Sequence, residues 1–298
     1  MGRDVKLGLI QMSCGDDIAE NCEKAFAGVR QAAAQGANII CLQELFKSRY
    51  FAQVEDHTQF ELAEDLAEGK GTLRDLGLLA GELGVVLVAG LFERRARGLY
   101  HNVAAVFDAD GSYLGKYRKM HIPDDPGYLE KFYFTPGDLG FQVFRTKFAD
   151  IGVLICWDQW FPESARLSAM AGAELILVPT AIGHKLPEDV EMRDEGYTHA
   201  WQTVQYGHAV ANACFFAAVN RVGVEESPNG VDGIDFWGSS FVADPFGRVV
   251  AQASADEEEV LVCQIDLDKV REMRDGWSFP FRDRRVDAYG GLTNLYLD

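Results

Sequence analysis

The sequence predicts a single α/β domain in which helices cover β-sheets, and three observations lead to this prediction. Short apolar runs typical of strands alternate along the chain with segments whose apolar residues recur at helical spacing. No Pro-, Ser- or Gly-rich linker divides the 298 residues, of which 48% are hydrophobic and 25% charged, as in globular proteins. Two similar hairpin signals, at 107–111 and 241–247, suggest two similar halves packed as one unit.

The first half begins with a strand and a helix whose ends are both marked. Val5–Gln11 is short, apolar and β-rich, and apolar residues at helical spacing follow over 18–33. Asp17 and Glu20 resemble a capping box, and Gly36 supplies a left-handed residue after the helix. The other elements expected in this half are strands over 37–42, 85–92, 101–107, 141–144 and 151–156, and a helix over 62–83 interrupted at 69–71.

The second half repeats this alternation. The elements expected here are a helix over 162–171, a strand over 174–178, a helix over 197–212 and a strand over 214–220. From about Met273 the chain is irregular and rich in aromatic residues. We expect this tail, 273–298, to pack on the body of the domain or on a partner subunit, and we expect residues 1–298 to form one domain.

The charge balance excludes several classes of partner. Lys and Arg number 28 against 46 Asp and Glu, which gives a net charge of −18 that repels polyphosphate and anionic lipid. Two short basic clusters, 94–97 and 282–285, lie beside acidic residues and are interpreted as solvated or structural. No run reaches the roughly 18 apolar residues of a membrane helix. We therefore expect a small-molecule substrate, with no nucleic acid and no membrane as partner.

Cysteine usage indicates a reducing compartment. None of the six cysteines forms a C-x-x-C pair, and no N-x-[ST] glycosylation acceptor occurs. The first residues carry one basic side chain before a strand-like run, which differs from a secretory leader. A cytoplasmic protein is therefore expected, in which most cysteines are small buried hydrophobic residues.

The candidate nucleophile is Cys156. It ends the apolar run 151–155 and is followed by Trp157 and a turn into a helix near Pro162. A strand, a thiol and a helix start in this order present the thiol at a tight turn, where backbone N–H groups stabilise a thiolate and an oxyanion alike. From its position alone, the alternative interpretation is a buried structural cysteine.

Two charged residues have candidate roles beside this thiol. Glu44 directly follows the strand over 37–42, and ligand clefts form at the carboxyl ends of strands in open α/β sheets. A partly desolvated carboxylate there can have its pKa raised into the range of a general base, and the alternative is a helix-capping or salt-bridged acid. Lys119 lies in the segment 115–123, where the alternative is a solvated lysine.

Sequence signatures of other chemistries are missing. The six histidines include no H-E-x-x-H, and no His/Cys spacing matches a common zinc site, although non-local metal ligands stay open. The G-x-S-x-G, G-x-x-x-x-G-K-[ST] and G-x-G-x-x-G signatures are also absent, which removes the usual serine hydrolases, nucleoside triphosphatases and dinucleotide enzymes. The sequence therefore favours cysteine chemistry, and its motifs do not support metal chemistry.

Three segments together resemble the nitrilase, or carbon–nitrogen hydrolase, superfamily: Gln43–Phe46, Lys116–Pro123 and Gly152–Glu163. The resemblance runs essentially end to end, and it implies a four-layer α-β-β-α sandwich with a Glu-Lys-Cys triad. It assigns the triad to Glu44, Lys119 and Cys156, and a second, structural glutamate to Glu130.

Within the superfamily, the segments 156–163, 179–183, 207–212 and 281–285 are similar to N-carbamoylputrescine amidohydrolases. This resemblance implies that a cationic N-carbamoyl amine is hydrolysed to the amine, CO2 and ammonia through a thioester. Glu44 would move the protons, and Lys119 with the Trp157 N–H would hold the oxyanion. The alternatives are hydrolysis of N-carbamoyl-β-alanine or aliphatic amides, or a catalytically silent binding module.

Five residues are assigned to substrate binding: Tyr50, Asp125, Trp157, Thr180 and Glu188. Acidic residues outnumber basic ones by five to two in the segment 184–196, and with Asp124 and Asp125 they form an acidic rim suited to a cationic substrate. The segment 184–198 departs from the superfamily pattern. The resemblance and the apolar tail also imply a homodimer or a larger even homo-oligomer.

Overall fold

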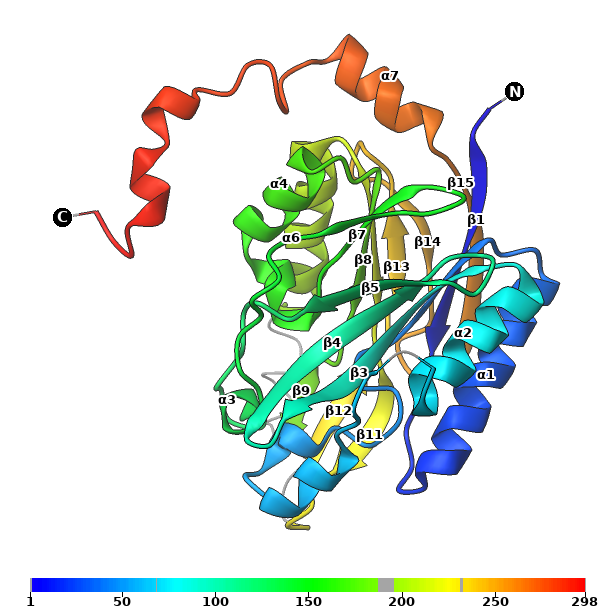
Figure 1. Cartoon of the computed structure of the whole chain (residues 1–298). Coiled ribbons are helices and arrows are strands. Elements are labelled where there is room, and N and C mark those ends of the chain that lie inside the picture. Colours follow the sequence, from blue (N-terminus) through cyan, green and yellow to red (C-terminus); the bar gives the residue numbers. More distant parts are fainter. Residues whose placement is uncertain (1, 68, 187–195, 231–232, 298) are drawn as a thin grey trace.

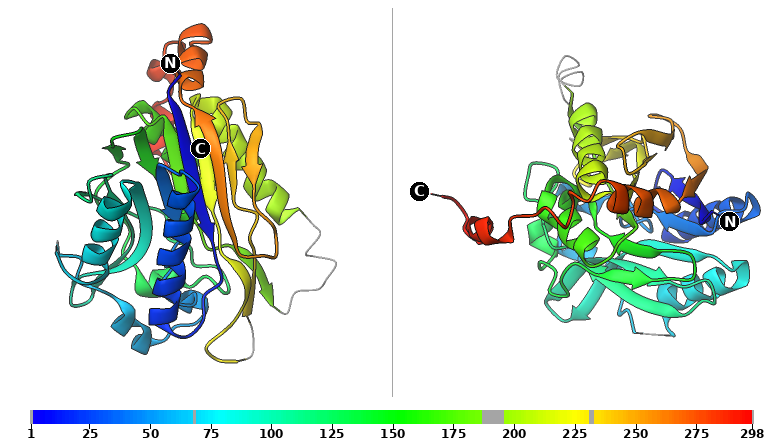
Figure 2. Two further views of the ribbon diagram at one scale, coloured as in Figure 1. Left: turned by 90° about the vertical axis from the view of Figure 1, so that its right-hand side faces the viewer. Right: turned by 90° about the horizontal axis from the view of Figure 1, so that it is seen from above.

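The computed structural model describes residues 2–67, 69–186, 196–230 and 233–297, and these residues are arranged in four layers. Two six-stranded mixed sheets pack face to face, and helices cover the outer face of each sheet (Figures 1 and 2). The four-layer α-β-β-α sandwich implied by the sequence resemblance is confirmed.

The first sheet has the order β15-β1-β2-β3-β4-β5. Its strands are β1 (Asp4–Gln11), β2 (Ile39–Leu42), β3 (Val86–Ala96), β4 (Leu99–Phe107), β5 (Tyr113–Arg118) and β15 (Glu259–Asp266). The strands β1, β2 and β3 are parallel, whereas β4, β5 and β15 join antiparallel. The outer face is covered by α1 (Ile18–Ala34) and α2 (Gly71–Leu83), whose apolar side chains pack on it.

The second sheet has the order β14-β13-β10-β8-β7-β6. Its strands are β6 (Val143–Arg145), β7 (Asp150–Val153), β8 (Leu175–Pro179), β10 (Phe215–Val219), β13 (Phe241–Ala243) and β14 (Val249–Gln252). Its outer helices are α4 (Pro162–Met170) and α6 (Tyr197–Asn212). A small third sheet joins β11 (Val222–Glu226), β12 (Gly233–Trp237) and β9 (Gly183–Leu186). The remaining short elements are α3 (Glu130–Tyr133), α7 (Asp268–Gly276) and 3-10 turns at 51–53, 57–62, 156–160, 286–288 and 290–293.

The two large sheets repeat one topology, as the two hairpin signals suggested. The parallel strands β7, β8 and β10 correspond to β1, β2 and β3, and each set continues into an antiparallel hairpin. Gly8 in β1 and Gly152 in β7 occupy equivalent places. A Cβ on Gly8 would lie 2.8 Å from the Cβ of Ala32, and one on Gly152 would lie 3.2 Å from the Cβ of Ser168. Glycine therefore lets a helix approach each sheet closely.

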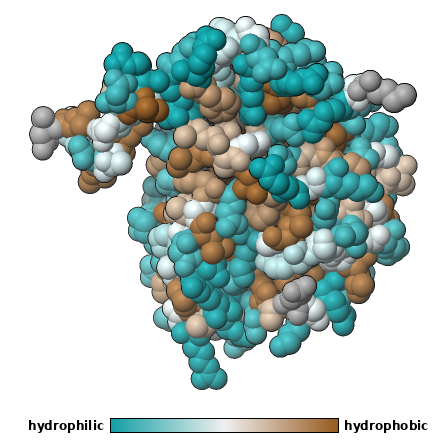
Figure 3. Space-filling model, turned by 45° about the horizontal axis from the view of Figure 1, so that its top comes forward, coloured by the Kyte–Doolittle hydropathy of each residue, from teal (hydrophilic) through white to brown (hydrophobic). Residues whose placement is uncertain are grey.

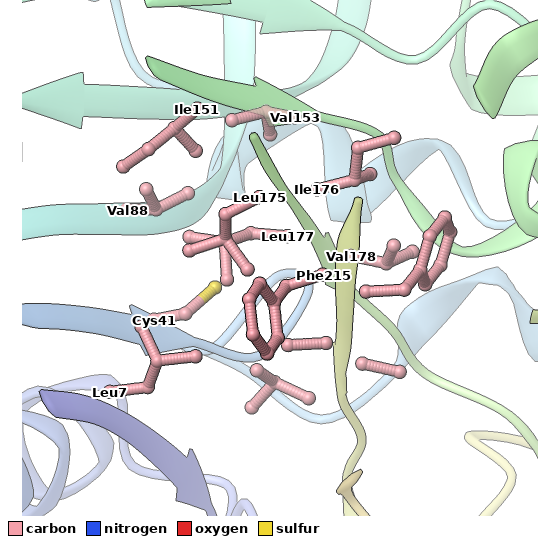
Figure 4. Close-up of a cluster of buried hydrophobic side chains, with 14 of the residues drawn as sticks. Leu7, Cys41, Val88, Ile151, Val153, Leu175, Ile176, Leu177, Val178 and Phe215 are labelled. Carbon is pink, nitrogen blue, oxygen red and sulfur yellow. The ribbon is translucent and has the colours of Figure 1, made fainter. Parts of the chain in front are cut away.

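The alternation of side chains along each strand sorts the core into layers. In β2, Ile39 and Cys41 face the opposite sheet, whereas Ile40 and Leu42 face the helices. Figure 4 shows the layer between the sheets, to which the first sheet contributes Leu7, Cys41 and Val88 and the second contributes Ile151, Leu175, Leu177 and Phe215. One apolar cluster therefore spans both sheets and fixes the strand ends of one sheet against those of the other.

Most predicted elements are confirmed, and two differ for local reasons. The interruption predicted at 69–71 is present, with positive φ angles of 78° at Gly69 and 51° at Gly71, but the helix begins only at Gly71. The part expected before the interruption is not a helix, because the backbone of Glu64 bonds to β3. The strand expected over 151–156 ends at Val153, because the Ile155 N–H donates to Asp158 Oδ2 rather than to a neighbouring strand. The strands β9, β11, β12 and β15 were not among the predicted elements.

The predicted start of α1 is confirmed by its hydrogen bonds. The Asp17 carboxylate accepts from the backbone N–H groups of Ala19 and Glu20, which have no partner inside the helix. The helix thereby starts at a fixed residue and runs along β1 toward the next strand.

The C-terminal residues form an arm. After α7, residues 277–297 extend away from the sandwich (Figure 1). Arg166 of α4 donates to the Pro280 carbonyl at 2.8 Å, but Leu292, Leu295 and Leu297 expose more than half of their surface, and apolar side chains are visible on the arm in Figure 3. Of the tail predicted to be irregular, 273–298, residues 273–276 belong to α7, and short 3-10 turns follow at 286–288 and 290–293. Among the described residues, no helix is long and apolar enough to cross a membrane.

Candidate active site

Glu44 lies just beyond β2 and is completely buried. Its Oε1 accepts hydrogen bonds from Lys119 Nζ at 2.8 Å and from Asn102 Nδ2 at 2.7 Å. Its Oε2 is buried without a hydrogen-bond partner among the described residues. One carboxylate oxygen is therefore held in place, while the other is available to exchange a proton with a neighbouring group.

Lys119 lies just beyond β5 and carries a buried positive charge. Its ammonium donates to Glu44 Oε1 and to both carboxylate oxygens of Glu130. Burial lowers the pKa of Lys119, but the Glu130 and Glu44 carboxylates outweigh burial and raise this pKa above its ordinary value. The lysine therefore stays protonated, as a group that stabilises negative charge must.

Glu130 begins α3 and completes a buried group of two carboxylates and one ammonium. Burial raises the pKa of Glu130 to about 7; Lys119 opposes this rise and the like charge of Glu44 adds to it. The Tyr50 hydroxyl donates to Glu130 Oε1 at 2.6 Å. Tyr50, which the sequence assigned to substrate binding, is thus completely buried and contacts a carboxylate of the site.

Cys156 opens the 3-10 turn that follows β7, and its backbone has a φ of 42°. A left-handed conformation is strained for a residue with a Cβ and is concentrated at functional sites. Burial, with the nearby Glu44 carboxylate, raises the pKa of the Cys156 thiol well above its ordinary value. The resting thiol is therefore protonated, and a base is needed to make it a nucleophile.

Asp158 connects the cysteine turn to the lysine segment. Its Oδ2 accepts from the Ile155 N–H at 3.0 Å and from the Tyr117 hydroxyl at 2.8 Å. Its Oδ1 accepts from the N–H of His121 at 3.0 Å, and the ring Nδ1 of that residue lies 2.7 Å away. Because Asp158 is completely buried, its four contacts hold the backbone on both sides of Lys119 against the backbone that carries Cys156.

A pocket of about 560 Å³ opens onto Cys156. The small third sheet supplies one wall, through His184 and Lys185 of β9 and Trp237 of β12. The aromatic side chains that line the pocket are Tyr128, Trp157, Trp160, Tyr197 and Trp237. Asp125 is also in its wall. The pocket therefore offers an apolar channel with charged groups of both signs.

Only some of the predicted substrate-binding residues line the pocket. Asp125 and Trp157 line the pocket. Thr180 is buried, and its hydroxyl lies 3.0 Å from the Val178 carbonyl and 3.3 Å from Gln159 Oε1, so it is held by the protein interior. Glu188, with most of the predicted acidic rim, lies outside the described residues.

Asn102 is a site residue that the sequence reasoning missed. Its side chain holds Glu44 Oε1, and its carbonyl accepts from the Lys119 N–H at 2.9 Å. It shares a face of β4 with Ala104 and Val106, which face the opposite sheet. A polar residue at an inward position of an apolar strand is the sequence signal that could have identified it. Among the described residues, no group of three His, Cys, Asp or Glu side chains is arranged to hold a metal ion.

Comparisons with known proteins identify the family of the chain. Residues 6–275 match the family model described as carbon–nitrogen hydrolase. A solved carbon–nitrogen hydrolase from Helicobacter pylori G27 is 45% identical, covers 99% of this chain and 100% of its own, and superposes with a TM-score of 0.93.

Two enzymes are similar over nearly their whole length. An N-carbamoylputrescine amidase from Arabidopsis thaliana is 48% identical over 98% of this chain and 96% of its own length. A citrullinase from Francisella tularensis is 40% identical over 98% of this chain and 99% of its own length. The superfamily resemblance stated from the sequence is confirmed, and the chain belongs to the carbon–nitrogen hydrolase family.

Proposed function

We propose that this enzyme hydrolyses N-carbamoylputrescine to putrescine, CO2 and ammonia through a thioester on Cys156. The observation that carries the proposal is the buried Glu44–Lys119–Glu130 group beside a thiol that opens onto an aromatic pocket. The similarity to N-carbamoylputrescine amidases supports the choice of substrate.

The first half of the reaction forms the thioester. Glu44 takes the proton of the Cys156 thiol on its unpaired Oε2, and the thiolate attacks the carbamoyl carbon. Lys119 and the Trp157 N–H hold the resulting oxyanion. Glu44 then gives its proton to the departing nitrogen, and the C–N bond breaks as ammonia or the amine leaves.

The second half returns the enzyme to its resting state. Glu44 takes a proton from a water molecule, which attacks the thioester carbon and displaces the Cys156 sulfur. The sulfur recovers its proton from Glu44. The released carbamic acid breaks down to CO2 and the remaining nitrogen product, so one molecule of water is consumed and neither an oxidant nor a cofactor is required.

The proposed orientation follows from the charges and rings in the pocket. The carbamoyl end lies at Cys156, and the butyl chain runs along Trp157 and Trp237. The distal ammonium lies toward Asp125, where a carboxylate and aromatic faces both stabilise a cation.

A second candidate substrate is citrulline, which is an N-carbamoyl amine that also carries a carboxylate. The observation that favours it is Lys185, which lines the pocket and carries an ammonium of the charge that would pair with that carboxylate. The 40% identity to a citrullinase supports this candidate as well.

Release of ammonia from a panel of substrates tests the proposal. The panel contains N-carbamoylputrescine, citrulline, N-carbamoyl-β-alanine, simple amides and nitriles, with Cys156→Ala as the inactive control. We expect the highest kcat/KM for N-carbamoylputrescine, and we expect added salt to lower it. A higher kcat/KM for citrulline, or for any anionic substrate, contradicts the proposed substrate.

Two pocket variants then separate the candidates. If Asp125 binds the distal ammonium, Asp125→Asn should lower kcat/KM for N-carbamoylputrescine by about tenfold. Lys185→Gln should leave that value unchanged and should lower kcat/KM for citrulline. If Asp125→Asn leaves kcat/KM for N-carbamoylputrescine unchanged while Lys185→Gln lowers kcat/KM for citrulline, the citrulline candidate is supported.

We also propose that the enzyme assembles as a homodimer or a larger even oligomer in a reducing, cytoplasmic compartment. The arm supports the assembly, since Leu295 is fully exposed and Leu292 and Leu297 are 65% and 69% exposed. All six cysteines lie in the described part of the chain and are free thiols, which supports the compartment. Light scattering that gives the mass of one chain, 33.0 kDa, contradicts the proposed assembly.

A further inference from the structure

A buried ion pair, separate from the Glu44–Lys119–Glu130 group, binds the loop that carries Glu44. Arg221 lies between β10 and β11, and Glu225 lies four residues later in β11. Arg221 Nη1 is 2.6 Å from Glu225 Oε1, and both side chains are almost completely buried. A buried pair of this kind is weak evidence for stability, because desolvation offsets most of the attraction. The other contacts of the pair therefore indicate a role besides stability.

Arg221 holds the main chain immediately after β2. Its Nη2 donates to the carbonyls of Glu44 at 3.1 Å and Leu45 at 2.8 Å, and its Nη1 donates to the carbonyl of Ser48 at 2.9 Å. Each Nη therefore has two acceptors. Lysine could not reproduce this set, because its single nitrogen lacks the planar fork of donors.

The loop held in this way is strained at its start. Leu45 has a φ of 49°, a left-handed conformation that a residue with a Cβ adopts only when its surroundings enforce it. The loop also lies close to β3, where a Cβ on Gly90 would lie 2.8 Å from Glu44 Cα and from the Leu45 nitrogen. The main chain at Glu44 is thus held by the Arg221 guanidinium and lies close to Gly90.

Glu225 holds the far end of the same loop. Its Oε2 accepts from the Tyr50 N–H at 2.5 Å. The Tyr50 ring packs on Tyr128 and Phe236, and its hydroxyl donates to Glu130. A shift of the Tyr50 backbone would therefore move the hydrogen bond that holds the second carboxylate.

We propose that the Arg221–Glu225 pair positions both carboxylates of the active site, Glu44 through the main chain of 44–48 and Glu130 through Tyr50. The proposal rests on the proposed amidohydrolase function. Arg221 and Glu225 are positioning residues, since neither lines the pocket at Cys156. Misplacement of a catalytic group by about 1 Å lowers turnover on the order of 100-fold, so loss of the pair should be visible in kcat.

The test compares Arg221→Lys and Glu225→Gln with a matched control. Arg274 also donates to main-chain carbonyls, at Ala173 and Ala213, which precede β8 and β10 at the opposite ends of these strands from Cys156. We expect Arg221→Lys and Glu225→Gln to lower kcat by about 10- to 100-fold with little change in KM. Arg274→Lys should lower the melting temperature and leave kcat unchanged.

A double-mutant cycle with Tyr50→Phe separates positioning from general loss of stability. Tyr50→Phe removes the hydroxyl on Glu130, so in that background Glu225→Gln should lower kcat much less than it does alone. Arg221→Lys should still lower kcat there, because it also acts through Glu44. Equal losses from Glu225→Gln in both backgrounds, or an unchanged kcat in a folded Glu225→Gln enzyme, would overturn the proposal. Glu225→Gln keeps the side-chain volume, so it tests the idea even if Arg221→Lys does not fold.

A second measurement does not depend on the substrate. The rate at which iodoacetamide alkylates Cys156, followed by mass spectrometry of its peptide, reports how well Glu44 activates the thiol. Alkylation should slow in both variants of the pair but not in Arg274→Lys. If the wild type hydrolyses none of the panel while this pattern holds, the proposed function fails and the positioning role stands. If the wild type is active and alkylation is unchanged, the positioning role fails alone.

Discussion

The ammonium of Lys119 lies 2.8 Å and 2.7 Å from the two carboxylate oxygens of Glu130. The same ammonium reaches Glu44, so one positive charge serves two carboxylates, and all three side chains are completely buried. Burial raises the pKa of Glu130 to about 7; the Lys119 ammonium opposes this rise, and the like charge of Glu44 adds to it. We therefore expect Glu130 to stay protonated up to about neutral pH, which a measurement in solution can detect.

Replacing Glu130 by Gln should change how stability depends on pH. The pKa of Glu130 is raised from 4.5 to about 7 in the folded enzyme, so the folded state binds more protons than the unfolded state between these values. Wild-type stability therefore falls, relative to Glu130→Gln, as the pH rises through this window, by up to about 3 kcal/mol. Urea unfolding of both proteins at pH 5 and pH 8 measures the difference. If the stability of the two proteins changes with pH in the same way, the pKa of Glu130 is not raised in the folded enzyme.

Asn102→Ala should impair catalysis more than stability. The substitution removes the donor to Glu44 Oε1 and leaves Lys119 as the other partner of that oxygen. We expect kcat to fall by about tenfold and the free energy of unfolding to fall by about 1–3 kcal/mol. Asn38 is a matched control, since its Oδ1 accepts from the Lys6 N–H far from the site. Asn38→Ala should lose stability and keep its kcat, and equal kcat values in the two variants would contradict the role given to Asn102.

Asp158→Asn should loosen two segments of the site at once. Both oxygens of Asp158 face donors, so an amide NH2 in place of either oxygen meets an N–H or O–H group. We expect a loss of about 2–4 kcal/mol in unfolding free energy and a kcat lower by about tenfold or more. Thermal unfolding and steady-state kinetics measure the two effects. A variant with lower stability but wild-type kcat would show that Asp158 supports only the fold.

The sequence alone offered Glu44, Lys119 and Cys156 only as candidates, and the family resemblance assigned them to a triad. Apolar runs identify β2 before Glu44 and β7 before Cys156, whereas β5, which precedes Lys119, has no such run. The four-layer arrangement came from the family resemblance. Alternation alone indicates covered sheets but does not say which sheet faces which.

The supporting residues could not be predicted, because their contacts depend on long-range packing. Arg221 is 177 residues from Glu44 in sequence, and Tyr50 is 80 residues from Glu130. Tyr50 was assigned to substrate binding, but its ring packs on Phe236 and Tyr128. Thr180 was also assigned to substrate binding, but its hydroxyl lies beside Gln159 in the protein interior.

The most direct test of the account is the mass of Cys156 during turnover. The enzyme is mixed with excess N-carbamoylputrescine, quenched in acid within the first turnovers, digested and analysed by mass spectrometry. We predict that the peptide containing Cys156 carries the carbonyl fragment of the substrate, with either ammonia or the amine lost, and that Cys156→Ala shows neither this adduct nor hydrolysis. Sustained hydrolysis by Cys156→Ala, or turnover by the wild type without any adduct on Cys156, would contradict the thioester mechanism.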